Sequence, residues 1–285
     1  TKVADALREA AARLAETSDT ARLDAEVLMA HALGVSRSEL LLQRMQDAAP
    51  NAFAALVERR ARHEPVAYIR GRKEFYGREF LVSREVLIPR MDSETIVMAA
   101  LEAAPAPGRV LDCGVGSGTL LLTLLAERPA ALGVGIDRDP AALMVASANA
   151  TQFGLDRRVR LERRDWDAPG WTEGLGRFDL VLANPPYVED DAPIPAAVRA
   201  WEPAGALFAG PEGLDAYRVL IPQVPALLSE NGVAVLEIGA TQAEPVAAIA
   251  AASGFATDLQ RDLADRPRAL VLRLRSGSAQ HGADK

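Results

Sequence analysis

The fold of this chain is decided by the stretch Val110-Leu111-Asp112-Cys113-Gly114-Val115-Gly116-Ser117-Gly118. An apolar, strand-like run ends there in a glycine-rich turn, and a helical pattern begins near Thr119. Glycines at alternate positions permit positive φ and let a ligand approach the backbone without a Cβ clash. The stretch therefore predicts a ligand-binding loop between a strand and a helix.

The loop differs from that of a dinucleotide site. Such a site has Gly-x-Gly-x-x-Gly, with a helix N-terminus facing a pyrophosphate, whereas Thr119 stands where the third glycine should fall. Asp112, just ahead of the loop, would repel an anion and attract a cation. S-adenosylmethionine meets this requirement because it carries a sulfonium and an α-ammonium and has no phosphate, so we expect it as the cofactor.

Polar side chains also stand at the ends of the next two predicted strands. Asp137 ends the second strand, where a carboxylate can accept from both ribose hydroxyls, and Asp165 and Trp166 follow the third, placed to reach an adenine edge. Taken singly, Asp137 can also be a helix cap before Pro140, and Trp166 can be a core residue. Their order at successive strand ends favours the cofactor site.

The fourth predicted strand runs into Asn184-Pro185-Pro186-Tyr187. Two prolines make this loop stiff and poor in N–H donors. An amide or aryl-amine NH₂ is a poor nucleophile, but the Asn184 side-chain oxygen and the Pro185 carbonyl can each accept one N–H and turn the nitrogen towards a methyl donor. Tyr187 offers a flat face for the planar acceptor, although such a loop can also be an ordinary surface turn.

Apolar strand-like runs alternate with helical stretches after Asp92, which is typical of α/β architecture. We expect a Rossmann-like domain over residues 92–275 with a seven-stranded mixed sheet. The predicted strands are 109–112, 132–137, 159–164, 179–183, 233–238 and a closing pair, 256–260 and 269–274.

Ahead of this domain, helical periodicity predicts a small helical domain over residues 1–71. Ser36 with Glu39 has the form of a capping box. Aromatic and β-branched residues between 72 and 91, Val86 to Ile88 included, predict a β-hairpin connector. The polar tail 276–285 is expected to be disordered.

Composition excludes several classes of protein. Of 285 residues, 49% are hydrophobic and 25% charged, which is ordinary for a globular chain with a core. No run of about 18 apolar residues and no signal-peptide pattern appears, so we expect a cytoplasmic protein that makes no use of a membrane. One cysteine, Cys113, excludes an internal disulfide framework, and three scattered histidines predict no metal site.

The net charge of −7 disfavours stable nucleic-acid binding. Two basic clusters leave two interpretations open, solvated faces or contact with an acidic or RNA-bound partner. They are Arg59, Arg60, Arg62, Arg70, Arg72 and Lys73 in one cluster, and Arg157, Arg158, Arg160, Arg163 and Arg164 in the other.

From about Leu23 to Arg273 the chain resembles the HemK/PrmC family of release-factor glutamine methyltransferases. Besides the two loops, the resemblance rests on five further blocks, which are Pro65 to Gly71, Phe75 to Phe80, Leu87 to Glu94, Glu202-Pro203 and Asp262-Leu263-Ala264. It implies methylation of the glutamine side-chain amide nitrogen in a Gly-Gly-Gln motif of a release factor, by a class I S-adenosylmethionine-dependent enzyme that leaves S-adenosylhomocysteine.

The resemblance also implies roles for residues of this chain. The helical domain would recognise the protein substrate, and we expect a monomer. The cofactor residues would be Asp112, Gly114, Val115, Gly116, Ser117, Gly118, Asp137, Arg138, Asp165, Trp166 and Asn184. The glutamine would be held by Asn184, Pro185, Pro186, Tyr187 and Arg90, with Asn184, Pro185 and Tyr187 as the catalytic set.

The chain departs from the family pattern at four positions. Family members usually have proline at Met91 and threonine at Ser93, and commonly leucine and threonine at Cys113 and Val115. We expect Met91 to loosen the connector, but none of the changes removes a group that the mechanism uses.

Three alternatives remain. A nucleic-acid methyltransferase acting on the exocyclic amine of adenine or guanine can use the same loop, but the acidic pI opposes it. In a ribosomal-protein glutamine methyltransferase the connector would diverge after Ile88-Pro89-Arg90, whereas here it continues as Asp92-Ser93-Glu94. In a binding module without activity, the helical domain would dock a partner, and the intact Asp137 and Asn184 oppose this.

Overall fold

The computed structural model describes residues 1–275, and the predicted tail 276–285 lies outside the described residues. The chain divides into two compact units. The first consists of Thr1–Arg72, Val82–Arg84 and Ile194–Glu202, and the second of Lys73–Leu81, Glu85–Pro193 and the chain from Pro203. Over the described range, each helix is too short or too polar to cross a membrane.

The first unit is helical. Its core is apolar and includes Leu7, Leu28, Met29, Leu40 and Phe53, all buried. The Ser36 side chain accepts a hydrogen bond of 3.1 Å from the Glu39 N–H, so the cap predicted there is present. The helices are α1 (Val3–Leu14), α2 (Ala21–Leu33), α3 (Arg37–Glu39), a π-helical turn η1 (Leu40–Arg44), α4 (Ala52–Ala61), α5 (Val66–Arg70) and α9 (Ala196–Trp201).

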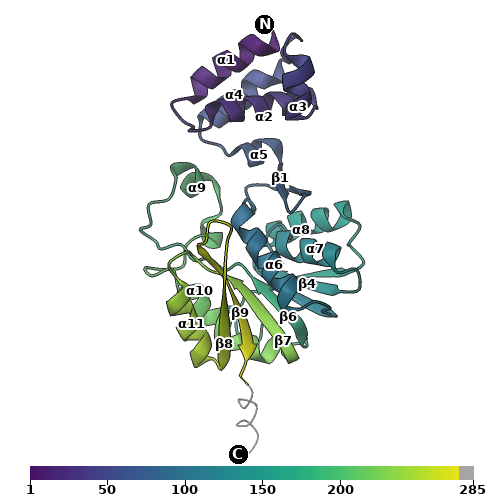
Figure 1. Ribbon diagram of the computed structural model, residues 1–285, viewed down its shortest axis with the longest axis vertical. Helices are drawn as coiled ribbons and strands as arrows, with labels where there is room; N and C mark the ends of the chain where they lie inside the picture. Colours follow the sequence, from purple (N-terminus) through teal and green to yellow (C-terminus); the bar gives the residue numbers. More distant parts are fainter. Residues whose placement is uncertain (276–285) are drawn as a thin grey trace, which may run out of the picture. The chain divides into compact units, whose positions relative to one another are not determined.

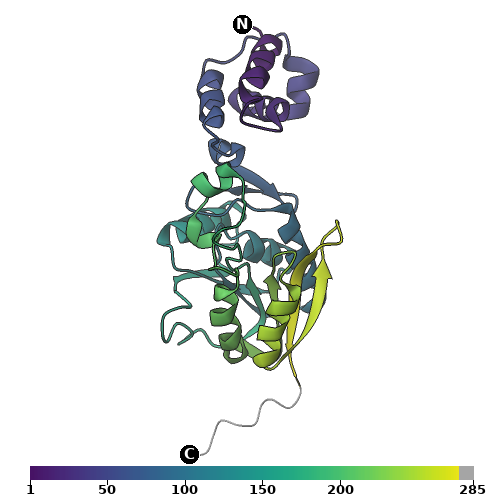
Figure 2. The same cartoon turned by 90° about the vertical axis from the view of Figure 1, so that its left-hand side faces the viewer.

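The second unit is built on a seven-stranded mixed sheet with strand order β5-β4-β3-β6-β7-β9-β8. The first five strands in this order are parallel, and β9 runs antiparallel to both β7 and β8. The predicted Rossmann-like α/β fold is thus confirmed. The strands are β3 (Arg109–Cys113), β4 (Leu132–Asp137), β5 (Val159–Arg163), β6 (Phe178–Ala183), β7 (Leu228–Glu237), β8 (Phe255–Arg261) and β9 (Pro267–Leu274). Figure 2 shows the yellow β8–β9 hairpin at one edge of the sheet.

Helices cover both faces of this sheet (Figure 1). On one face lie α6 (Glu94–Ala103), α7 (Thr119–Glu127) and α8 (Pro140–Gln152), and on the other α10 (Asp215–Leu220), η4 (Ile221–Leu227) and α11 (Ala243–Ala252). Because both faces are covered, the central strands are apolar almost throughout, as in β6 with the buried run Leu180 to Ala183. The carboxyl ends of the parallel strands therefore meet along one edge, where the loops after them converge.

The connector is shorter than predicted. The hairpin consists of β1 (Arg72–Phe75) and β2 (Arg78–Leu81) alone. The expectation that Val86, Leu87 and Ile88 belong to it is wrong, because residues 82–90, all of them described, form no strand. Val86 and Ile88 are apolar residues that are buried without forming a strand. In the sequence they are indistinguishable from the apolar residues of a strand.

Candidate active site

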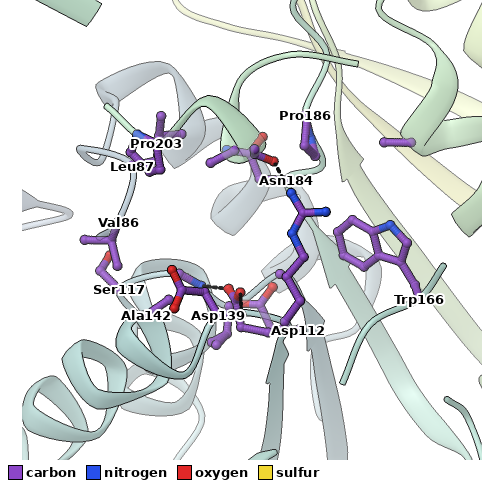
Figure 3. A pocket seen from close by; sticks show the side chains of 18 of the residues that line it. Val86, Leu87, Asp112, Ser117, Asp139, Ala142, Trp166, Asn184, Pro186 and Pro203 are labelled. Carbon is purple, nitrogen blue, oxygen red and sulfur yellow. Dashed lines mark hydrogen bonds between the residues drawn. The ribbon is translucent and has the colours of Figure 1, made fainter. Parts of the chain in front are cut away.

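A cavity of about 580 Å³ opens where the loops after the parallel strands converge. Every described residue that lines it belongs to the second unit. In Figure 3, Asn184 and Pro186 lie on one side of the cavity, Asp112 and Ser117 on the other, and Trp166 at one flank. The predicted site residues that line it are Arg90, Asp112, Gly114, Val115, Gly116, Ser117, Asp137, Arg138, Asp165, Trp166, Asn184 and Pro186. Gly118, Pro185 and Tyr187 are not among the lining residues over the described range.

The glycine loop leaves room for a ligand by its backbone conformation. Gly114, Gly116 and Gly118 have φ of 78°, 52° and 82°, in the region that side chains disfavour. A Cβ at Gly114 would come within 3.2 Å of the Trp166 ring, whereas one at Gly116 would meet no described atom within 4 Å. Gly116 thus borders open cavity.

Gly118 ends the glycine loop and begins the helix after it. It is the N-cap of α7, and a Cβ there would fall 2.8 Å from Leu122 Cδ1. The absence of a side chain at Gly118 lets Leu122, in the first turn of the helix, pack against the end of the loop.

Asp112 is a buried carboxyl with an unused acceptor. It is 1% exposed, and among residues 1–275 its Oδ1 has no hydrogen-bond partner. Burial raises the pKa of Asp112 to about 7. An unsatisfied buried acceptor is costly. Asp112 is also one of the residues that line the cavity, so its carboxyl suits a ligand that brings a cationic donor.

Asp137 joins two loops at the cavity wall. Its carboxylate accepts hydrogen bonds of 3.0 Å from the backbone N–H groups of Gly116 and Asp139, and burial raises its pKa. The alternative that Asp137 caps the following helix is wrong, because Asp139 is the N-cap of α8 and accepts from the Ala141 N–H at 2.8 Å. A carboxylate has about four lone-pair sites, so Asp137 keeps acceptor capacity for two hydroxyls.

The remaining predicted cofactor residues are partly engaged with the backbone. The Arg138 guanidinium donates to the Gly205 carbonyl at 3.2 Å, and the Asp165 carboxylate accepts from the Asp167 N–H at 3.0 Å. Trp166 is half-buried, packs against the core and lines the cavity, so it is partly a core residue, and its contact with the adenine stays a prediction. Within residues 1–275 no group of three or more His, Cys, Asp or Glu residues is placed to hold a metal ion.

The loop Asn184-Pro185-Pro186-Tyr187, which we call the acceptor loop, presents two of its four residues to the cavity. Asn184 and Pro186 line it, while Pro185 is buried. The Tyr187 hydroxyl donates a hydrogen bond of 3.2 Å to the carboxylate of Glu237, and burial together with the Glu237 charge raises the pKa of Tyr187. The loop is therefore anchored at Tyr187 and presents its amide at Asn184.

Several residues of the site have no signal in the sequence. Asn149, in the last turn of α8, donates to the carbonyls of Ser117 and Leu81 at 2.8 and 3.0 Å, and thereby ties the glycine loop to the hairpin. Gln242 donates to the Tyr187 carbonyl at 3.0 Å. These partners are far apart in the chain, and a lone amide side chain in a sequence does not indicate them.

Many side chains of the two basic clusters form ion pairs or hydrogen bonds within the protein. In the first cluster, Arg59 pairs with Glu64 and Arg60 with Asp24 at 2.7 Å. In the second, Arg158 donates to four backbone carbonyls, and Arg160 and Arg164 pair with Glu162. Several cations of the two clusters are therefore bonded within the protein, which leaves fewer of them for contact with a partner.

Comparisons with known proteins identify the family of this chain. Residues 5–71 match the PrmC N-terminal domain, and residues 89–205 match the methyltransferase small domain. A release factor glutamine methyltransferase of Cereibacter sphaeroides is 42% identical over 96% of this chain and 99% of its own length. One from Caulobacter vibrioides is 41% identical over 89% of each chain.

A solved methyltransferase from Pyrococcus furiosus matches with a TM-score of 0.52, covering 70% of this chain and 89% of that one at 15% identity, which bears on the fold alone. The two relatives are far above the similarity that shared ancestry requires and run nearly end to end. The chain belongs to the family of release factor glutamine methyltransferases.

Proposed function

We propose that this protein transfers a methyl group from S-adenosylmethionine to the side-chain amide nitrogen of a glutamine in the Gly-Gly-Gln motif of peptide chain release factors. The relatives, which are release factor glutamine methyltransferases, support this proposal. The observation that carries it is that Asn184, an acceptor for an amide N–H, and Asp112, an unsatisfied buried acceptor for a cation, line one cavity.

The residues present fit S-adenosylmethionine. In this proposal the Asp112 carboxylate accepts from the α-ammonium of S-adenosylmethionine and the Asp137 carboxylate from its ribose hydroxyls. The unpartnered Asp112 Oδ1, the Asp137 bond to the Gly116 N–H and the open space at Gly116 support it. Trp166 and Asp165 offer a ring face and a carboxylate for the adenine. When bound, this group supplies an activated methyl on a sulfonium.

Asn184 orients the acceptor. An amide nitrogen attacks poorly because its lone pair is shared with the carbonyl, so holding it in one orientation is the main contribution the protein can make. The Asn184 oxygen accepts one N–H, and the Pro185 carbonyl is the candidate for the other, although Pro185 is buried. Pro186 on the wall and Arg90 at the connector complete the proposed glutamine site.

We propose that the helical unit recognises the body of the release factor. It has a core of its own and contributes no residue, over the described range, to the cavity wall. Among the described residues, the cavity wall comes from the second unit. We propose a monomer that works in the cytoplasm, where translation factors act.

The test is mass spectrometry of a release factor after incubation with the protein and S-adenosylmethionine. A gain of one methyl group on the Gly-Gly-Gln glutamine is expected. Methylation of added DNA, RNA or a ribosomal protein in place of the release factor would contradict the proposal. An unmodified release factor would do the same.

A further inference from the structure

Glu237 is a buried carboxylate at the end of β7 that the proposed chemistry does not use. It is 1% exposed. Its Oε2 accepts a hydrogen bond of 2.6 Å from the Ser93 hydroxyl, and its Oε1 accepts one of 3.2 Å from the Tyr187 hydroxyl. One side chain thus holds two hydroxyls that are 94 positions apart in the chain (187 minus 93).

The two hydroxyls come from two segments of the cavity wall. Ser93 lines the cavity itself and follows Arg90, which also lines it. Tyr187 ends the loop that begins with Asn184. A displacement of Glu237 would therefore move both the segment at Ser93 and the loop from Asn184 to Tyr187.

The acceptor loop transmits such a displacement because it is stiff. Between Asn184 and Tyr187 stand Pro185 and Pro186, whose rings fix φ. A second anchor comes from Gln242, whose Nε2 donates to the Tyr187 carbonyl at 3.0 Å and to the Gly213 carbonyl at 3.1 Å. Gln242 thus holds the backbone of Tyr187, and Glu237 holds its ring.

Burial of this carboxylate is expensive for stability. Burial raises the pKa of Glu237, while the Ser93 hydroxyl and the charge of Arg268 oppose the rise. An apolar side chain of similar size at a buried site is often neutral or stabilising compared with a buried charge. The Glu237 carboxylate thus destabilises the fold but forms directional hydrogen bonds to Ser93 and Tyr187. Such an arrangement is expected where the geometry of the neighbouring cavity has to be held.

We propose that Glu237 is a positioning residue, which sets the placement of Asn184 by holding the hydroxyls of Tyr187 and Ser93. The inference rests on the proposed function and adds a determinant of its rate outside the cavity wall. Tyr217 provides the contrast, because its buried hydroxyl donates at 2.7 Å to the backbone carbonyl of Glu237 and leaves the carboxylate alone.

The kinetic test compares Tyr187→Phe and Glu237→Gln with Tyr217→Phe. The first two should lower kcat on a release factor by about 10- to 100-fold, since a misplacement of about 1 Å can cost about 100-fold. Their KM for S-adenosylmethionine and their affinity for S-adenosylhomocysteine should change much less than kcat, because Asn184 is only one of the residues proposed to bind them. Tyr217→Phe loses a fully buried hydroxyl and should lower the melting temperature without lowering kcat.

Ser93 supplies a rescue pair. Ser93→Ala removes the donor and should lower kcat, whereas Ser93→Thr keeps a hydroxyl and should restore it. If Glu237→Gln does not fold, Tyr187→Phe and the Ser93 pair decide the matter. Wild-type kcat in Tyr187→Phe, or an equal loss in Tyr217→Phe, would overturn the proposal.

A crystallographic arm is independent of any substrate. Structures of wild type and Tyr187→Phe with S-adenosylhomocysteine should differ in the position of Asn184. An unmoved Asn184 would overturn the positioning role even if the wild type proves inactive on release factors. Such inactivity would by itself count against the proposed function, so the two failures are distinguishable.

Discussion

The carboxylate of Asp137 accepts a hydrogen bond of 3.0 Å from the backbone N–H of Gly116. The end of β4 and the glycine loop after β3 are thereby joined at the cavity wall, and the loop can keep a conformation with φ of 52° at Gly116. The space beside Gly116 stays open.

Gly116→Ala should impair ligand binding more than folding. Alanine at positive φ costs about 1 to 2 kcal/mol, and the added methyl projects into the space proposed for the ligand. We expect the affinity for S-adenosylhomocysteine, measured by calorimetry, to fall at least about tenfold, which is about 1.4 kcal/mol.

Gly154→Ala is the matched control for that change. Gly154 has φ of 67°, and a Cβ there also meets no described atom within 4 Å, but the residue does not line the cavity over the described range. Both variants should melt at similarly lowered temperatures, and only Gly116→Ala should lose affinity. Equal affinities in the two variants would contradict the placement of the ligand at Gly116.

Asn184→Ala should abolish most methyl transfer while the protein stays folded. The side chain lines the cavity, so its loss creates no core void, and removal of one orienting or stabilising polar group typically costs about 100- to 1,000-fold in kcat. The rate is measured by incorporation of labelled methyl into a release factor, with the melting temperature as the check on folding. Turnover at the wild-type rate would exclude the orienting role.

Asp112 should make the binding of S-adenosylhomocysteine depend on pH. The ligand carries an ammonium, which is matched by the ionised carboxylate, whereas burial raises the pKa of Asp112 to about 7 in the free protein. Affinity should therefore weaken by up to about tenfold per pH unit as the pH falls below about 7, and level off above it. Titration calorimetry between pH 5.5 and 8.5 measures this, and Asp112→Asn should bind weakly with little dependence on pH.

The same carboxyl should affect stability in the free protein. The folded pKa of Asp112, about 7, lies above the ordinary value of about 3.9. The stabilisation that the protonated carboxyl gives the folded state is therefore fully present below about pH 4 and is lost as the pH rises through about 7, which lowers the free energy of unfolding by about 4 kcal/mol. The difference in unfolding free energy between Asp112→Asn and wild type should therefore grow in favour of the variant across this range. Asp258→Asn, at an exposed position of β8, should run parallel to wild type.

Deletion of residues 1–62 should separate protein recognition from cofactor binding. These residues form most of the helical unit, and no described residue among them lines the cavity. We expect kcat/KM on an intact release factor to fall at least about 100-fold, equivalent to about 2.7 kcal/mol, while S-adenosylhomocysteine affinity and activity on a short Gly-Gly-Gln peptide persist. A parallel loss of affinity for S-adenosylhomocysteine would argue against a recognition role.

Met91→Pro should stabilise the protein. Met91 is 72% exposed and is the first residue of the short helical turn η2 (Met91–Ser93), a position that tolerates proline because it needs no N–H bond within the helix. The preceding Arg90 has φ of −101° and ψ of 141°, which suits a residue before proline. The expected gain is about 0.4 to 1 kcal/mol in urea unfolding. A loss of stability would show that Met91 does not loosen the connector.

What the sequence determined by itself was local. The glycine loop after β3, the positions of the strands along the chain and the stiff Asn184 loop all follow from residues adjacent in the chain, because φ preferences and apolar periodicity act over a few positions. These patterns also placed Asp112 and Asp137 at neighbouring strand ends, since parallel strands end at the same edge of a sheet.

The tertiary structure alone decided which polar atoms meet. Tyr187 bonds to Glu237 rather than facing the cavity, Arg60 is bound by Asp24, and the Asp112 Oδ1 remains unsatisfied. Each depends on the side chains that packing brings together from distant parts of the chain. Hydrogen bonds and the cost of burying a charge depend on distances of a few ångströms and on exclusion of water, and neither quantity is written in the order of the residues.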